Sequence, residues 1–250
     1  MKKTLVCLLI AVLALSTALP ALSEIKSGDV ITFGTFEQNN NSKDGKEPIE
    51  WLVLETDGSQ AFLLSRYVLT CRKFNGSKSM NLSWSSSSIR KWLNDKFLDG
   101  FSKKEQAAIV TTTVDNSAAQ SETGACSGGK ETKDKVFLLS YAELNTYFPE
   151  RADKRAVYTD SAIKAVNDGS MTFAKLKKFL TESYDGCYLW YLRSFKEDMF
   201  TGAPFPELIH EDGDTSFIGC SPILVYGIRP ALVLDLDKGE KYIQVVEPAD

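Results

Sequence analysis

The chain has 250 residues, of which 43% are hydrophobic and 25% charged, and its formal net charge is −4. This composition is typical of a globular protein. Mild acidity without a basic cluster excludes the many phosphate contacts that nucleic-acid binding needs, so we expect no nucleic-acid partner.

The first 23 residues have the pattern of a secretory signal peptide. Lys2 and Lys3 precede an apolar run from Leu5 to Leu15, and the small-residue pattern Ala21-Leu22-Ser23 follows. The run is too short for a comfortable membrane span, although an uncleaved anchor is the alternative. We predict a signal peptide over residues 1–23 and a single domain over 24–250, secreted and without an integral membrane span after cleavage. The oligomeric state stays open.

Strands are expected first. The stretch GDVITFGTFEQ, which starts at residue 28, alternates so that Ile31 and Phe33 share one face of a strand. A hairpin follows, in which strands over 49–55 and 61–65 are joined by a turn at Asp57-Gly58.

Helices come next along the chain. Behind a serine-rich stretch that can cap a helix, residues 89–97 carry apolar side chains at helical spacing. A second helix begins at Ser102, with Glu105 completing a capping box. A third follows a short apolar strand in KVFLLS and is capped by Ser140 with Glu143.

Residues 115–135 carry almost no large apolar side chain, and we expect an exposed loop there. Two more helices are expected over 160–167 and 172–181, the latter burying Phe173, Leu176 and Leu180 while its lysines face solvent.

The last third of the chain returns to strands. In GCYLWYLRSF, at 186–195, both faces are bulky, which predicts a central strand covered on both sides. A terminal hairpin is expected to turn at Lys238-Gly239. Strands at both ends with helices between them predict an α+β domain whose termini share a sheet. The expected strands are 187–193, 206–210, 215–220, 223–235 and 241–246.

Four cysteines follow the predicted signal peptide, too few for a disulfide scaffold. Two alternatives stay open for Cys71, Cys126, Cys187 and Cys220. They are thiols, or one bridge joins Cys187 to Cys220, which both fall in expected strands.

Motifs for catalysis are absent from the sequence. His210 is the one histidine, and a catalytic histidine would use Asp212 or Asp214 as its orienting acid, but a strand entering an Asp-Gly turn explains ELIHEDGDTS more simply. No C-x-x-C pair, G-x-S-x-G elbow or phosphate-binding glycine loop occurs. We therefore assign no catalytic residue, metal site or cofactor, while a calcium site built from separate loops stays open. Asp212, Asp214 and Arg193 are the candidate ligand-binding residues.

Two arginines stand beside apolar strands. A buried guanidinium needs a partner, and Glu50 and Asp235 are both candidate partners for either arginine, Arg193 or Arg229. A structural ion pair is favoured over a ligand-facing cation. The residues expected to have structural roles are Glu50, Trp51, Trp190, Arg193 and Arg229.

Several blocks in order, among them KEPIEWLVLE, FLLSRYVLTCRKFN, DKVFLLSYAEL, LWYLRS and YGIRPALVLDL, resemble a domain family of unknown function in exported proteins of gut Gram-positive bacteria. The resemblance spans about residues 28–236. The family's WWLRSPG stretch is LWYLRSF here, with Phe195 in place of proline.

The ending LWYLRS…GIRPAL is similar to the last part of the C-type-lectin-like fold, which formylglycine-generating enzymes share. This resemblance implies an α+β fold with antiparallel sheets, adjacent N- and C-terminal strands and helices inserted between them. Cys187 and Cys220 do not reproduce the closely spaced cysteine pair of those enzymes, so oxidase activity is not carried over.

These observations lead us to expect a secreted, non-catalytic recognition domain that binds a glycan, peptide or cell-surface component. A fold shared with lectins does not prove sugar binding. One alternative is a secreted hydrolase with two catalytic carboxylates, such as a glycoside hydrolase. Another is a structural envelope module, which would show an extensive apolar surface patch.

Overall fold

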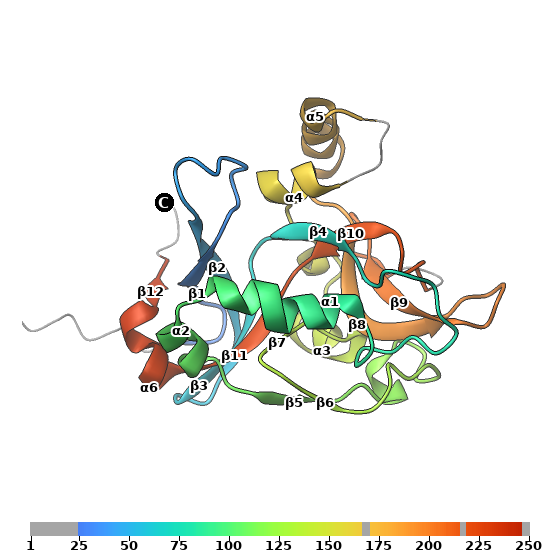
Figure 1. Ribbon diagram of the computed structural model, residues 1–250, viewed down its shortest axis with the longest axis horizontal. Helices are drawn as coiled ribbons and strands as arrows, with labels where there is room; N and C mark the ends of the chain where they lie inside the picture. Colours follow the sequence, from blue (N-terminus) through green and yellow to red (C-terminus); the bar gives the residue numbers. More distant parts are fainter. Residues whose placement is uncertain (1–24, 167–170, 216–218, 247–250) are drawn as a thin grey trace, which may run out of the picture.

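The computed structural model describes residues 25–166, 171–215 and 219–246, so the predicted signal peptide lies outside the described residues. The fold is α+β, with two main sheets and helices around them (Figure 1). No helix in the described ranges is long and apolar enough to cross a membrane.

The first sheet brings the two ends of the described chain together. Ile31 lies opposite Val245, so the N-terminal and C-terminal strands are neighbours, as expected. In spatial order the strands are β12 (Gln244–Val245), β1 (Val30–Phe36), β2 (Glu47–Thr56), β3 (Gln60–Ser65), β11 (Ala231–Asp235) and β7 (Val136–Phe137).

The core of this sheet follows the predicted alternation. Ile31 and Phe33 are buried, and the indole of Trp51 donates to the Phe33 carbonyl at 2.8 Å. The β1–β2 register shifts between Thr32 and Thr35, and Gly34 lies inside that shift with a positive φ of 68°. The ring of Phe101 packs against Gly34, where a Cβ would stand 2.1 Å from a ring carbon, so this position needs glycine.

The second sheet has β8 in its interior. All of its residues except Glu197 are buried, which confirms the central strand predicted from GCYLWYLRSF. The strands, in spatial order, are β4 (Thr70–Lys73), β10 (Val225–Ile228), β8 (Trp190–Glu197) and β9 (Pro204–Ile209). A separate pair consists of β5 (Thr112–Val114) and β6 (Thr132–Asp134).

The single strand expected over 223–235 is wrong. The chain leaves the second sheet after β10, passes through Arg229-Pro230 and enters the first sheet as β11. Pro230 has no N–H to donate to a ladder, although its carbonyl accepts from the Ser65 N–H at 2.8 Å. This crossing connects the two sheets.

The terminal hairpin expected at Lys238-Gly239 is also wrong. The Asp235 side chain accepts from the Lys238 N–H at 3.1 Å and caps a short helix, α6 (Leu236–Gly239), which continues as a 3₁₀ turn (Glu240–Tyr242). The strand expected over 215–220 is not formed at its described residues, where Thr215 makes only an isolated bridge to Ile209.

Both predicted capping boxes are confirmed, at Ser102 with Glu105 and at Ser140 with Glu143.

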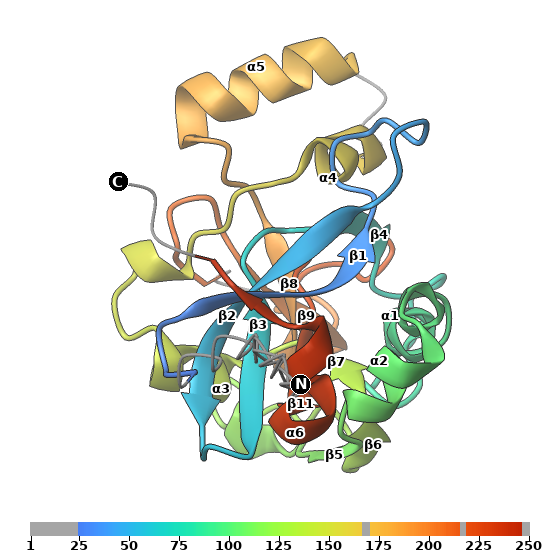
Figure 2. The same cartoon turned by 90° about the vertical axis from the view of Figure 1, so that its left-hand side faces the viewer.

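The helices lie around the two sheets. Helix α1 crosses the front of the molecule in Figure 1, and α5 lies beyond α4, away from the sheets, in Figure 2. The α-helices are α1 (Ser88–Trp92), which continues as a π-helical turn (Leu93–Phe97) and a 3₁₀ turn (Leu98–Gly100), α2 (Lys103–Ala108), α3 (Tyr141–Tyr147), α4 (Asp160–Ala165) and α5 (Phe173–Tyr184).

The segment 115–135 is exposed over much of its length, as its composition predicts, but it is not a loop throughout. It forms a 3₁₀ turn (Ala118–Gln120) and β6, and it buries Asn116, Ser121 and Cys126. The buried Asn116 is held by its amide nitrogen, which donates to the Lys130 carbonyl at 2.9 Å, while its Oδ1 has no hydrogen-bond partner among the described residues.

Candidate functional site

A pocket of about 730 Å³ opens where the 115–135 segment meets the end of β8. Its wall carries three carboxylates and a single lysine, which is an unusual concentration of charge for a concave surface. The lining residues are Glu122, Thr123, Ala125, Cys126, Lys196, Glu197, Asp214 and Thr215.

The β8–β9 hairpin positions the lysine. The register between these strands shifts between Tyr191 and Phe195, and consecutive side chains around the shift are buried, Lys196 among them. Lys196 forms an ion pair with Glu122, and the other Glu122 oxygen accepts from the Thr215 hydroxyl at 3.0 Å. Burial lowers the pKa of Lys196, while the negative charges of Glu207 and Asp214 oppose this effect.

A buried glutamate lies behind the pocket wall. Glu207, on β9, is fully buried; its carboxylate accepts from the Glu122 N–H at 3.0 Å and from the Ser194 hydroxyl. Burial raises the pKa of Glu207 to about 7, although the hydrogen bond from Ser194 and the charge of Lys196 act in the opposite direction. Glu207 is therefore ionised in only part of the molecules at neutral pH.

Glu197 adds the third carboxylate of the lining, and Cys126 adds a neutral thiol. Among the described residues no side-chain hydrogen bond or ion pair involves Glu197, so its carboxylate is available to a ligand. The pKa of the Cys126 thiol is raised to about 11, first by burial and then by Glu197 and Glu207. A thiol with so high a pKa is a poor nucleophile at neutral pH.

The structure separates the residues that the sequence singled out. Asp214 lines the pocket, whereas Asp212 lines a different one with Arg155 and Glu211. Both aspartates pair with the exposed Arg151, Asp214 at 3.2 Å.

Arg193 is buried and does not line this pocket. It pairs with Glu143, whose Oε1 lies 2.7 Å from Nη2, so the expected ion pair exists with a different carboxylate. Glu50 as its partner is wrong, because Glu50 pairs with Arg66 at 2.8 Å. The Glu143 side chain also completes the predicted α3 capping box, so the same carboxylate has a second role as the partner of Arg193.

Arg229 is buried without a carboxylate among the described residues. Asp235 as its partner is wrong, because that carboxylate pairs with Lys238. Arg229 instead donates to the Ser65 carbonyl at 2.9 Å and lies 5.1 Å from the centre of the Trp190 ring. Burial lowers the pKa of Arg229 to about 9.

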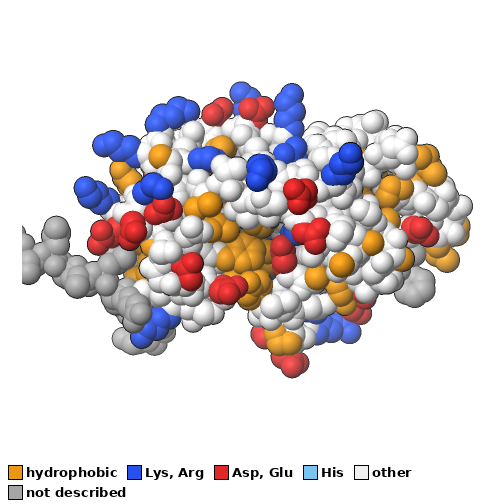
Figure 3. All heavy atoms as spheres, turned by 90° about the horizontal axis from the view of Figure 1, so that it is seen from below, with side chains coloured by type: hydrophobic (Ala, Val, Ile, Leu, Met, Phe, Trp, Pro, Cys, Tyr) orange, Lys and Arg blue, Asp and Glu red, His pale blue; other side chains and the backbone are white. Residues whose placement is uncertain are grey.

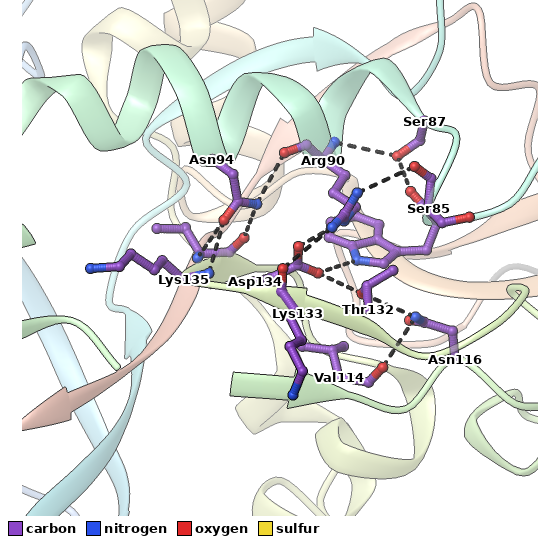
Figure 4. A network of polar contacts seen from close by, with 12 residues as sticks. Ser85, Ser87, Arg90, Asn94, Val114, Asn116, Thr132, Lys133, Asp134 and Lys135 are labelled. Carbon is purple, nitrogen blue, oxygen red and sulfur yellow. Dashed lines mark hydrogen bonds and ion pairs between the residues drawn. The ribbon is translucent and has the colours of Figure 1, made fainter. Parts of the chain in front are cut away.

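A second polar cluster surrounds Asp134 and is shown in Figure 4. Its buried carboxylate accepts from Trp84 Nε1 at 2.9 Å, from the Thr132 hydroxyl at 2.7 Å and from Arg90 Nε at 2.7 Å. The other guanidinium nitrogens of Arg90 donate to the carbonyls of Ser85 and Lys133. Because these groups bond one another, the cluster attaches α1 to β6, and we assign it a structural role.

A metal site and a histidine at the pocket are two further possibilities for the described part of the chain. No group of three or more histidine, cysteine, aspartate or glutamate residues there is arranged to hold a metal ion. His210 does not line the charged pocket, and its Nδ1 lies 3.8 Å from Glu211.

Comparison with known proteins supports one part of the expected resemblance, a domain family of unknown function. Residues 58–236 match the model of a domain of unknown function, DUF6273. The match covers more than half of the chain, which therefore belongs to the DUF6273 family. No curated protein and no solved structure matches it.

Proposed function

We propose that the protein is an exported recognition domain that binds a peptide carrying a primary ammonium group in the charged pocket. The charge of the pocket wall supports this proposal. Glu122 already pairs with Lys196, and Asp214 with Arg151, whereas the Glu197 carboxylate at the end of β8 has no such partner in the described part. A lysine side chain or a peptide amino terminus would supply the missing cation through charge-assisted hydrogen bonds.

The proposal extends to location and fold. Export is inferred from the signal-peptide pattern of residues 1–23. A C-type-lectin-like arrangement is inferred from the resemblance of the C-terminal blocks, and the adjacency of β1 and β12 with helices inserted between them supports it. Binding is argued from the pocket alone, because a fold does not define a ligand.

Calorimetry with two matched peptides tests the function. Ac-Ala-Lys-Ala-NH₂ should bind, and the same peptide with norleucine for lysine should not. Glu197→Gln should weaken the lysine peptide about two- to fivefold, the effect of one exposed ion pair. Glu182→Gln, which removes an exposed carboxylate on α5, is the matched control and should bind as the wild type does. Equal binding of both peptides, or ligands found only on a glycan array, would reject the peptide proposal.

A carboxylate hydrolase is the second candidate, and the raised pKa of Glu207 favours it. A carboxylic acid with a pKa of about 7 suits a general acid, and Glu122 is close by. Burial argues against this role, since Glu207 does not line the pocket. The test is hydrolysis of a panel of chromogenic glycosides. Activity in the wild type that is lost in Glu207→Gln would establish the hydrolase, and no turnover by the wild type would reject this candidate.

A structural envelope module is the third candidate. Hydrophobic side chains gather in the middle of the face seen in Figure 3, with acidic side chains around them. Apolar patches on a soluble protein often mark contacts with other macromolecules. Sedimentation equilibrium that shows only monomers at all concentrations would speak against self-assembly through this face.

A further inference from the structure

Glu207 connects three parts of the molecule around the pocket. Its Oε1 accepts the N–H of Glu122 in the pocket wall, at 3.0 Å, and its Oε2 bonds the hydroxyl of Ser194 on β8. Ser194 Oγ in turn accepts the N–H of Tyr141, the first residue of α3, at 3.0 Å. A single buried carboxyl group therefore holds the pocket wall to β8 and, through Ser194, to α3.

The titratable groups near Glu207 come from β8 and from the 115–135 segment. Lys196 contributes a positive charge from β8, and Cys126 lies near enough from the 115–135 segment for the carboxylate to raise its pKa. From the same segment Glu122 contributes its backbone N–H, while its own carboxylate is occupied by Lys196. Through Ser194, α3 contributes only a backbone N–H.

The hydrogen bonds depend on whether Glu207 carries a proton. An ionised carboxylate has only acceptors, which suits the Glu122 N–H and the Ser194 hydroxyl together. A protonated carboxyl has a donor on one oxygen. On Oε1 this donor opposes the N–H of Glu122; on Oε2 it requires the Ser194 hydroxyl to turn and accept, and the neutral carboxyl is then a weaker acceptor for that N–H. Because the pKa of Glu207 is about 7, both states are populated near neutrality.

We propose that Glu207 is a positioning residue for the pocket, and that loss of its proton fixes the Glu122 backbone and raises the affinity for a cationic ligand. The proposal rests on the proposed function, because it takes an ammonium group as the ligand. A bound cation favours the ionised carboxylate behind the wall, and by linkage the ionised carboxylate favours the cation to the same degree. Affinity should therefore rise as pH rises through about 7.

The pH profile of binding tests the linkage. The wild type should bind Ac-Ala-Lys-Ala-NH₂ about three- to tenfold more tightly at pH 8 than at pH 5.5, the size expected for one buried charge behind the site. Glu207→Gln mimics the protonated carboxyl and should bind weakly, with no pH dependence. Glu207→Asp keeps the carboxylate and should restore part of the pH dependence, which a purely structural role would not do.

A second measurement uses the protein without ligand. The amide resonance of Glu122 should shift with pH about a midpoint near 7 in the wild type and stay constant in Glu207→Gln. An amide that does not titrate, or a pH-dependent affinity that survives in Glu207→Gln, overturns the inference. A titrating amide in a protein that binds no lysine peptide at either pH supports the positioning role and rejects the proposed function instead.

Discussion

Two buried arginines are stabilised by different interactions. Arg193 has a carboxylate partner in Glu143 and also donates to the carbonyls of Leu138 at 2.9 Å and Asp115 at 3.0 Å. Arg229 has carbonyls and aromatic rings instead, and its Nη1 lacks a hydrogen bond. An ion pair that loses one partner leaves an uncompensated charge behind, whereas an arginine without a carboxylate leaves none.

Replacing each arginine by methionine should distinguish the arginine that has a carboxylate partner from the one that has none. Arg193→Met is expected to lower the free energy of unfolding by about 3 kcal/mol or more, because Glu143 loses its cation in a partly buried place. Arg229→Met should lower it by no more than about 1–2 kcal/mol, since it breaks bonds to carbonyls but removes a costly buried charge. Urea unfolding of both variants measures the difference, and equal losses would contradict this account.

Glu207 should also make stability depend on pH. Its pKa rises from the ordinary 4.5 to about 7 on folding, so between these values the folded state binds more protons than the unfolded state. The contribution of Glu207 is therefore fully present below about pH 4.5 and is lost as pH rises through 7. Relative to Glu207→Gln, the wild type should lose about 2–3 kcal/mol of stability from pH 4.5 to 8. Parallel pH profiles of the two proteins, measured by urea unfolding, would show the pKa shift to be absent.

The sequence supplied a weak signal for the pocket residues. Lys196 and Glu207 are charges within apolar strands, the same argument that drew attention to Arg193 and Arg229. For Lys196 the neighbouring Glu197 weakens this signal, since two adjacent charges are typical of a strand end that faces solvent. Glu122 carried no signal, since its place depends on a hydrogen bond to a residue 85 positions later.

At the scale of elements, local chemistry predicted well. The two capping boxes form because each serine and glutamate lie within one turn of each other, and the β2–β3 hairpin forms around Asp57-Gly58. The predictions were wrong for elements whose structure depends on partners distant in the sequence. The run 223–235 is continuous in pattern, yet its two halves pair with strands from opposite sheets.

Helix α5 is expected to be the least stable helix of the molecule. It lies away from both sheets in Figure 2, and apart from buried Leu176 and Leu180 it depends on contacts with α4, such as Lys177 with Asp160 at 2.7 Å. A helix of 12 residues is marginal without packing. Its amides should exchange with deuterium about 100-fold or more faster than those of β3, which has strands on both sides. Mass spectrometry of peptides covering 173–184 and 60–65 checks this, and equal protection would refute it.

At the scale of the whole molecule, the described residues form one hydrophobic core without disulfide cross-links. The two sheets share one hydrophobic core and are joined by the Arg229-Pro230 crossing, so burial of apolar surface can stabilise the fold. The sequence left the disulfide state open between thiols and a Cys187–Cys220 bridge. In the structure the four described cysteines are thiols, and three of them are buried.

Alkylation of the purified protein should reflect this arrangement. In denaturant without reductant, iodoacetamide should label Cys71, Cys126, Cys187 and Cys220, giving four additions by intact mass in protein expressed as residues 24–250. In the folded protein at pH 8 the three buried cysteines should react slowly, because burial both hides their sulfur atoms and raises their pKa. Cys220 is only partly buried and should be labelled first. Two additions in denaturant, rising to four after reduction, would show a bridge and contradict the structure.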